Sequence, residues 1–304
     1  MRVSCPVCGS VPARRWRSEG PYQVVRCSRC GLGITWPPPS EEQLAEFYQG
    51  DYYHRHGMGD AGAAGWWERS EGILGRVPAE LRRVLDVGAG QGHLVAALRA
   101  RGIHADGVEP LESGRHAARS RYGLSLFDSW PAPEAEPYDL VTLVHSLEHV
   151  RDPLAVVTAA SRQVRKGGFL FVDVPHAGSV ELLRPARRRA ILALPGHLFH
   201  FTPKSLAILI DRAGWDVRAV HLFNPDFLEW AFALRARVRR VPEPTEAPVE
   251  IASPAGEAPC APPSPMQPTW HRLLPGLRSL FPGYRFETVA QLRAPSTLDR
   301  RQSS

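Results

Sequence analysis

The sequence is almost without lysine and has no long apolar run. Lys166 and Lys204 are its only lysines, so arginine supplies nearly all of the 37 basic side chains. The net charge of +6 at pH 7 is modest, and it permits an anionic partner without requiring one. No apolar stretch approaches the roughly 18 residues of a membrane span. The N-terminus also lacks the apolar core of a signal peptide. We therefore expect a cytoplasmic protein without a membrane span.

Cysteine is scarce as well, but four of the five cysteines are grouped. They form two C-x-x-C pairs with eighteen residues between them: Cys5, Cys8, Cys27 and Cys30. Gly9 and Gly31 each follow a pair, where a tight turn needs positive φ. Two disulfides or a redox pair are the alternatives, but the spacing is typical of a zinc ribbon. Four thiolates leave zinc no open position, so the site is expected to be structural. A ribbon that binds substrate or nucleic acid is the second interpretation.

The ribbon is expected over residues 1–38, followed by a helical segment over 39–80. Ser40 and Gln43 form a capping box that predicts a helix from Glu41. A second helix is expected near residues 66–75. The tyrosines between them, Tyr48, Tyr52 and Tyr53, either close a lid over a ligand or pack the helix onto the next domain.

From residue 81 to 240 strands and helices alternate. Strands are expected at 83–88, 103–110, 124–127, 138–146, 169–175 and 215–223, with helices at 92–102, 111–123, 152–167 and 202–214. The alternation predicts an α/β fold, a doubly wound and mostly parallel sheet covered on both faces. A last, antiparallel strand near 284–294 would complete seven strands beside 215–223. Residues 241–268 contain nine prolines and are expected to be a disordered insertion, as is the tail at 295–304.

Three glycines follow the first of these strands and precede a helix: Gly88, Gly90 and Gly92. Such a loop binds a nucleotide at the carboxyl end of a strand. A dinucleotide loop would need glycine where His93 stands, and a phosphate loop would need G-K-[ST], which is absent. Asp86 would repel a pyrophosphate but suits a ligand with an amino group and a sulfonium. Glu109 ends the next strand, where a carboxylate accepts from ribose hydroxyls. S-adenosylmethionine fits this pattern best.

Longer motifs carry a family resemblance. The stretches "VLDVGAGQGH", "GVEP", "YDLVTLVHSLEHVRDP" and "RKGGFLFVDVP" occur in the order of class I S-adenosylmethionine-dependent methyltransferases, with their Rossmann-like fold. "SLEHVRDP" resembles the subgroup of ubiquinone-type O-methyltransferases and many sugar and natural-product enzymes. The start, "CPVCG…CSRCG", is similar to members that carry a zinc ribbon in front of this domain.

The resemblance implies a set of cofactor-binding residues. The methionine part would lie against Asp86, Gly88, Gly90, Gly92, His145 and Ser146. The ribose would lie at Glu109, and the adenine amino group near Asp128. Ala89 and Pro110 complete the expected cofactor-binding set. The methyl donor is already a strong electrophile, so the enzyme aligns the nucleophile and removes a proton.

Histidine suits that base role, because its ordinary pKa of about 6.5 is near neutrality. Four candidates stand near the expected site: His145, His149, His197 and His200. In the structural alternative, His149 braces a helix, while His197 and His200 pack down their own loop. Glu148 could orient a histidine. Arg184 and Arg187–Arg189 either bind an anionic group of the substrate or form a solvated basic helix.

Three functions remain open. The first is methyl transfer to a small molecule, most simply a sugar, lipid-linked or natural-product hydroxyl. The second is RNA methylation, with the ribbon and arginines holding phosphates. The sequence lacks an N/D-P-P-Y motif after the strand that ends near residue 146, which disfavours methylation of a base amine. The third is a binding module that has kept only the fold.

Overall fold

The computed structural model describes residues 4–11, 14–48, 62–131, 136–179, 182, 185–223 and 285–293. The expected insertion at 241–268, the tail at 295–304, Tyr52 and Tyr53 lie outside the described residues. Among the helices it describes, none is long and apolar enough to cross a membrane.

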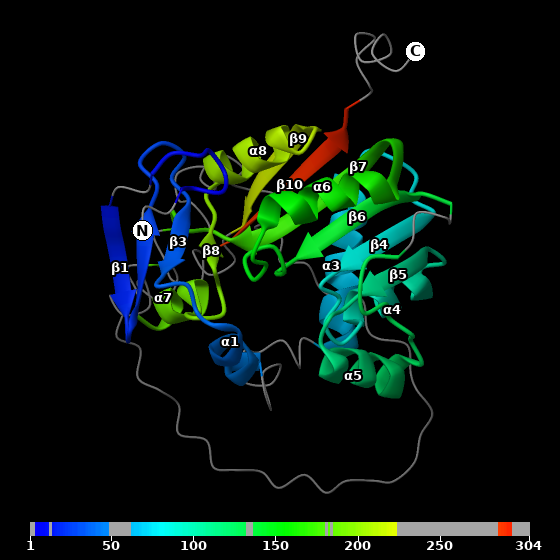
Figure 1. The fold of residues 1–304 in the computed structure, drawn as a ribbon. Coiled ribbons are helices and arrows are strands. Elements are labelled where there is room, and N and C mark those ends of the chain that lie inside the picture. The colour runs from blue at the N-terminus through cyan, green and yellow to red at the C-terminus, as the bar shows by residue number, and fades with distance from the viewer. Residues whose placement is uncertain are drawn as a thin grey trace, which may run out of the picture. The chain divides into compact units, whose positions relative to one another are not determined.

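A six-stranded sheet in the order β5-β4-β6-β7-β10-β9 organises the described chain (Figure 1). Its strands are β4 (Arg83–Val87), β5 (His104–Val108), β6 (Tyr138–Val144), β7 (Val164–Pro175), β9 (Trp215–Phe223) and β10 (Arg285–Leu292). The pairs β4–β5, β4–β6 and β6–β7 are parallel, whereas β10 is antiparallel to β7 and to β9. The doubly wound, mostly parallel sheet and its antiparallel last strand are therefore confirmed.

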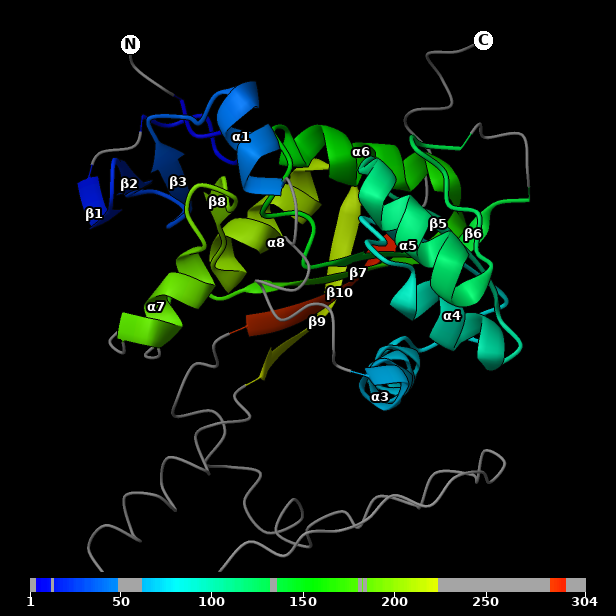
Figure 2. The ribbon, with the colours of Figure 1, turned by 90° about the horizontal axis from the view of Figure 1, so that it is seen from below.

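Helices cover both faces of this sheet. They are α3 (Gly62–Arg76), α4 (His93–Ala100), α5 (Glu112–Tyr122), α6 (Pro153–Gln163) and α8 (Pro203–Arg212). Figure 2 shows α3 and α6 on opposite sides of the strands. Val84 and Phe171 belong to the apolar core with α3, α4 and α5, while Leu85 and Val172 belong to the core with α6 and α8. Side chains alternate across a strand, so each strand supplies both cores.

The prediction of a third strand at 124–127 is wrong. Only Phe127 reaches the sheet, through an isolated parallel bridge to Val108. Its N–H donates to the Gly107 carbonyl, and its own carbonyl accepts from the Glu109 N–H. Gly123 closes α5 just before this segment, which leaves too few residues for a ladder. The sheet therefore has six strands and this bridge within the described residues, in place of seven strands.

The helix expected to run to Gly167 ends at Gln163. Val164 already pairs with Tyr138 at the start of β7, and the register shifts before Phe169 pairs with Leu140. Gly167, with a φ of +72°, lies in this irregular stretch, so its left-handed backbone serves a bulge within the strand. The other end of α6 is as expected, because the Asp152 side chain accepts from the Ala155 N–H.

A second, smaller sheet combines the N-terminal segment with a distant one. Its order is β1-β2-β3-β8, with β1 (Arg14–Glu19), β2 (Tyr22–Arg26), β3 (Gly33–Trp36) and β8 (Phe199–His200). Helix α1 (Glu41–Tyr48) follows it and begins at the expected capping box of Ser40 and Gln43. Helix α7 (Pro185–Leu192) precedes β8. The ribbon strands are thus extended by a strand from the loop after β7.

Thr35 fastens these two segments together. Its N–H donates to the Leu198 carbonyl, and its Oγ1 donates to the His197 carbonyl at 2.6 Å. The same Oγ1 lies 3.0 Å from His200 Nε2. Since its one proton is given to His197, the hydroxyl oxygen accepts from the His200 ring. Gly33 makes the approach possible, because an added Cβ there would lie 2.9 Å from the Cβ of His200.

We predict that Thr35→Val lowers the free energy of unfolding by about 1–3 kcal/mol, because buried polar groups of His197 and His200 lose their partner. Urea unfolding of the full chain measures the change. Thr35→Ser keeps the hydroxyl and is expected to retain most of the stability. A Thr35→Val protein as stable as the wild type would show that this hydroxyl does not hold the loop.

Candidate functional site

The glycine loop between β4 and α4 has the backbone that its sequence predicts. Gly88, Gly90 and Gly92 have φ values of +79°, +55° and +78°, which side chains rarely adopt. A Cβ on Gly88 would lie 2.4 Å from the Cβ of Ser146, so the loop closely approaches the chain that follows β6. Gly92 differs, because a Cβ there would meet Ala118 at 3.0 Å on α5. Its glycine therefore serves helix packing.

Two buried carboxylates flank the loop. Asp86, on β4, accepts from the Thr142 hydroxyl at 2.6 Å. Burial raises the pKa of the Asp86 carboxyl to about 6, although the Thr142 bond and the charge of Arg69 act in the opposite direction. Glu109 accepts from the Gly90 N–H at 2.7 Å and from a second backbone N–H at 2.8 Å. Burial raises the pKa of Glu109 as well.

The other residues expected near the ribose and adenine are more open. Pro110 and Asp128 are exposed, and Asp128 follows the bridge residue Phe127, whose carbonyl accepts from the Glu109 N–H. Asp128 therefore stands beside the Glu109 backbone. Ala89 is buried, and its N–H donates to the Val108 carbonyl at 2.9 Å. These residues lie around one end of β5, and their contact with a cofactor stays a prediction.

The chain after β6 carries polar groups without hydrogen-bond partners. His145 has a φ of +51°, and its N–H donates to the Asp173 carbonyl at 2.9 Å. The Ser146 hydroxyl and both carboxylate oxygens of Glu148 are buried and have no hydrogen-bond partner among the described residues. Buried polar groups are normally paired. These atoms therefore have hydrogen-bonding capacity left for a polar ligand.

Glu148 is the centre of a histidine cluster. Its Oε1 lies 3.5 Å from His145 Nδ1 and 4.0 Å from His197 Nε2. The rings of His149 and His197 are 4.7 Å apart and nearly perpendicular. Ligand atoms of Glu148, His149 and His197 lie within 4.8 Å of one another, a set that could hold a metal ion. Of the four candidate bases, three thus meet at one carboxylate.

His200 has a structural position. It is 4% exposed, and its ring donates to Thr35 as described above. Burial lowers the pKa of His200 to about 3. Burial, together with the neighbouring His149 and His200, also lowers the pKa of His197 well below its ordinary value. His197 Nδ1 lies 2.9 Å from the Ile191 carbonyl. Both rings are therefore neutral at neutral pH and fasten their own loop.

Tyr48 joins the cluster from α1, a role that the sequence pattern did not reveal. Its hydroxyl lies 2.8 Å from His149 Nδ1, which is also 3.1 Å from the Gly196 carbonyl. A ring held at Nδ1 by two groups has a fixed orientation. The sequence showed only that Tyr48 stands near two further tyrosines, and this could not identify a histidine 101 residues away.

A buried charge network joins α3 to the sheet, and no sequence pattern indicates it. Arg69 of α3 and Arg285 of β10 both donate to Asp173 on β7. Arg285 also lies 3.1 Å from Glu287, which pairs with Arg76 at 2.7 Å. The network ties α3 to two strands and brings the charge of Arg69 toward Asp86. Its members come from residues 69 to 287, so no local motif indicates it.

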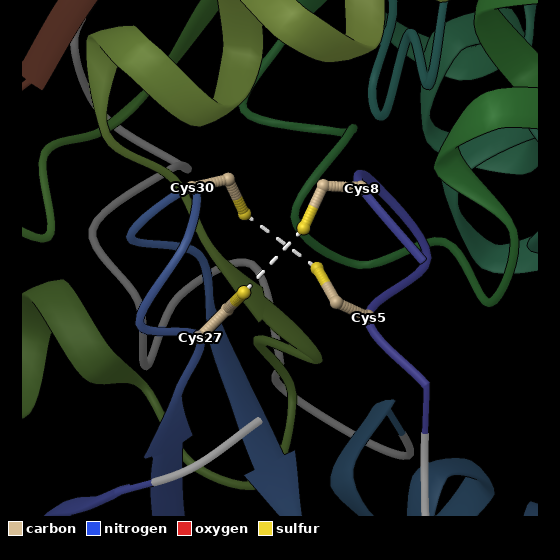
Figure 3. Close-up of side chains that lie close together, drawn as sticks. All are labelled: Cys5, Cys8, Cys27 and Cys30. Atoms are coloured by element: carbon tan, nitrogen blue, oxygen red, sulfur yellow. Dashed lines mark hydrogen bonds between the residues drawn. The ribbon is translucent and has the colours of Figure 1, made fainter. Parts of the chain in front are cut away.

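The four cysteine sulfurs converge from two turns, as Figure 3 shows. Cys5 Sγ lies 3.6 Å from Cys30 Sγ, and Cys8 Sγ lies 3.5 Å from Cys27 Sγ. All four lie within 4.8 Å of one another and are free thiols, not disulfides. Zinc–sulfur bonds in a tetrahedron place sulfurs about 3.8 Å apart. The donor set therefore fits a zinc ion.

The two cysteine turns have matching backbone bonds. The Gly9 N–H donates to the Cys5 carbonyl at 2.8 Å, and the Gly31 N–H donates to the Cys27 carbonyl at 2.9 Å. Both glycines have positive φ, +72° and +83°, as expected. Burial acts to raise the pKa of the Cys27 thiol, but hydrogen bonds from Cys30 and other neighbours lower it to about 6. This thiol thus readily becomes the thiolate that a metal needs.

The expected arginine group is only partly described. Arg184 and the side chain of Arg187 lie outside the described residues. Arg188 is half-buried and Arg189 is exposed, both on α7. Whether they meet a substrate stays a prediction.

Known proteins resemble the chain over the region that holds the glycine loop. A family model described as a methyltransferase domain matches residues 66–220, just over half of the 304 residues. A ubiquinone biosynthesis O-methyltransferase from Vibrio atlanticus is 38% identical over 113 residues, which are 34% of this chain and 45% of that protein. Another, from Aromatoleum aromaticum, is 34% identical over 119 residues, 35% of this chain and 47% of that protein. The matches thus span about half the length of these relatives.

The fold also has solved counterparts. A SAM-dependent methyltransferase from Archaeoglobus fulgidus superposes with a TM-score of 0.51, covering 80% of this chain and 100% of that one at 15% identity. At this identity the likeness concerns the fold alone. The family match over residues 66–220, more than half of the chain, shows that the chain belongs to the methyltransferase domain family.

Proposed function

We propose that the chain transfers a methyl group from S-adenosylmethionine to a small-molecule hydroxyl. One observation carries the proposal: the glycine loop packs against Ser146 at Gly88, and the buried carboxylates of Asp86 and Glu109 flank the same loop. We call the glycine loop, these two carboxylates and Ser146 Oγ, which has no hydrogen-bond partner among the described residues, the cradle. A cationic ligand with a ribose fits such a cradle.

Each part of the cradle has a definite task. The two backbone N–H groups hold the Glu109 carboxylate in place, and each of its oxygens keeps a lone pair for a ribose hydroxyl. The ionised Asp86 attracts the positive amino and sulfonium groups. Asp128, beside the Glu109 backbone, would accept a hydrogen bond from the adenine amino group. His145 and Ser146 face the methionine part.

The bound cofactor supplies an activated methyl group, and the chain aligns the acceptor and removes its proton. Among the histidines, His149 is best placed as the base, because Tyr48 and the Gly196 carbonyl orient its ring. If its Nδ1–H donates to Gly196, the lone pair is on Nε2. Glu148 stabilises positive charge in the cluster. The relatives are O-methyltransferases by name, which supports a sugar, lipid-linked or natural-product hydroxyl as the acceptor.

The cysteine site is proposed to hold structural zinc. Four thiolates occupy every position of a tetrahedral ion, so the metal would take no part in methyl transfer. Its task is to stabilise a segment too short to have a core of its own. Through β3 the ribbon also supports the loop of His197 and His200.

Binding of S-adenosylmethionine is predicted to strengthen as the pH rises through about 6. The pKa of Asp86 is raised to about 6, so its carboxylate is protonated below that pH and attracts the cation only above it. Affinity should fall by up to about tenfold per pH unit below 6. Calorimetric titration of wild type, Asp86→Asn and the exposed control Asp211→Asn would measure this. Among these three proteins only Asp86→Asn should lose most of the change near pH 6, and a flat wild-type profile would contradict the assignment.

Zinc content gives an independent prediction. Elemental analysis should find one zinc per chain in the wild type, and Cys27→Ser should lose zinc and stability, because a ligand is removed. Cys260→Ser is the matched control and should retain the metal. Retention of zinc by Cys27→Ser would place the ion elsewhere.

The proposed activity is tested with methyl-labelled S-adenosylmethionine, the purified chain and fractionated cell extract. Label is expected in the small-molecule or glycan fraction. Label in nucleic acid that disappears with ribonuclease would make the chain an RNA methyltransferase. Absence of cofactor binding would make it a binding module.

Once an acceptor fraction is found, the base can be tested. His149→Gln should lower kcat by about 10²- to 10⁴-fold while the affinity for S-adenosylmethionine stays unchanged. His116→Gln, on the surface of α5, is the matched control. An unchanged kcat in His149→Gln would remove His149 from the base role.

A further inference from the structure

A cavity of about 660 Å³ lies between the second cysteine turn, the loop after β7 and the start of α8. Its lining includes three cations, Arg26, Arg29 and Lys204, together with His176 and Thr202. None of the residues that line it in the described chain is acidic. Figure 1 shows α8 beside the N-terminal ribbon. The cations thus come from two segments that are far apart in the sequence.

Polar atoms converge on the backbone of this cavity. An added Cβ on Gly31 would lie 3.4 Å from Thr202 Oγ1 and 3.6 Å from Arg26 Nη2. The space beside the bare Cα is therefore bordered by a guanidinium and a hydroxyl. Thr202 is also the N-cap of α8, a ten-residue helix, whose positive end lies at the cavity.

Neutralisation of zinc thiolates does not account for all of these charges. At the first cysteine turn, Arg212 donates to the carbonyls of Pro6 and Val7. At the second, Lys204 donates to the Arg29 carbonyl and Arg26 to the Gly31 carbonyl. These contacts brace the turns. The exposed Arg29 side chain is additional, and it makes no hydrogen bond or ion pair to the described residues.

The cavity is lined by the loop that follows β7, at the edge of the sheet that carries the proposed active site. The loop of His176 and Gly178 leaves the carboxyl end of β7, and His145 leaves the carboxyl end of the parallel strand β6. Residues 197–204 lead from the histidine cluster through β8 to Thr202 and Lys204. A molecule whose hydroxyl lies at His149 could therefore extend toward the cavity.

We propose that this cavity binds the phosphate or pyrophosphate group of the methyl acceptor. Cations on two sides and a helix N-terminus suit a group with several charged oxygens, which accept charge-assisted hydrogen bonds. The acceptor would then be a phosphorylated small molecule, linked to a nucleotide or to a lipid. The identity of the ligand as acceptor rests on the proposed function, whereas binding of the anion does not.

The test is calorimetric titration of the zinc-loaded full chain with inorganic pyrophosphate at low salt, without S-adenosylmethionine. Wild type should bind it, and Arg29→Gln and Lys204→Gln should each weaken binding by about tenfold or more, the effect of one charge-assisted hydrogen bond. Arg162→Gln, an exposed arginine on α6, is the matched control and should bind as wild type does. Zinc content should not change in these variants, and the unfolding midpoint should not change in Arg29→Gln, whose side chain braces nothing in the described residues.

Several outcomes would overturn the proposal. They are no binding by wild type, equal binding by all variants, or loss of zinc in Arg29→Gln and Lys204→Gln, which would make these cations supports of the thiolates. A wild-type protein that binds a homopolymeric RNA but does not bind pyrophosphate would also contradict it. If UDP binds more tightly than pyrophosphate, the ligand is linked to a nucleotide. If the protein co-sediments with phosphatidic acid vesicles, the ligand is linked to a lipid. Failure of S-adenosylmethionine binding would refute the proposed function and leave this result standing.

Discussion

The short ladder between β3 and β8 is the constraint on which the rest of the structure depends. Thr35 donates to the chain at His197 and accepts from His200, so a strand of the cysteine-rich segment fixes the loop after β7. That loop carries one side of the histidine cluster and leads to the start of α8. The N-terminal segment is thus a support for the site, because its own strands would otherwise leave β3 with an open edge.

Electrostatics divides the functional edge of the molecule into two parts. Asp86 and Glu109 make the glycine loop acidic, which suits a cationic cofactor, and burial keeps water from screening them. At the cavity beside the second cysteine turn, arginine and lysine gather without an acidic partner among the lining residues. The histidine cluster around Glu148 joins the segment after β6, which contacts the glycine loop, to the loop of His197, which leads through β8 to the cavity. A substrate with an anionic group and a reactive hydroxyl would match this division of charge.

The zinc-ribbon motif and the glycine loop were both predictable, because their spacing is local. Positive φ at Gly88 and Gly31 follows from turns of a few residues, and helix starts such as Ser40 depend on side chains three positions apart. The prediction of a strand at 124–127 was wrong, because strand propensity does not show how many residues of a segment pair with the neighbouring strand. The predicted end of α6 at Gly167 was wrong, because Val164 already pairs with β6.

Sequence alone determined the alternation of strands and helices, the cysteine pairs and the acidic glycine loop, since each is encoded in short-range spacing. Tertiary structure alone decided which histidines meet. His149 contacts Tyr48, and His200 is hydrogen-bonded to Thr35, over separations of 101 and 165 residues. Tertiary structure also assembled Arg29 and Lys204 around one cavity. Such contacts depend on how sheets and loops pack, and no period or motif within the chain records that packing.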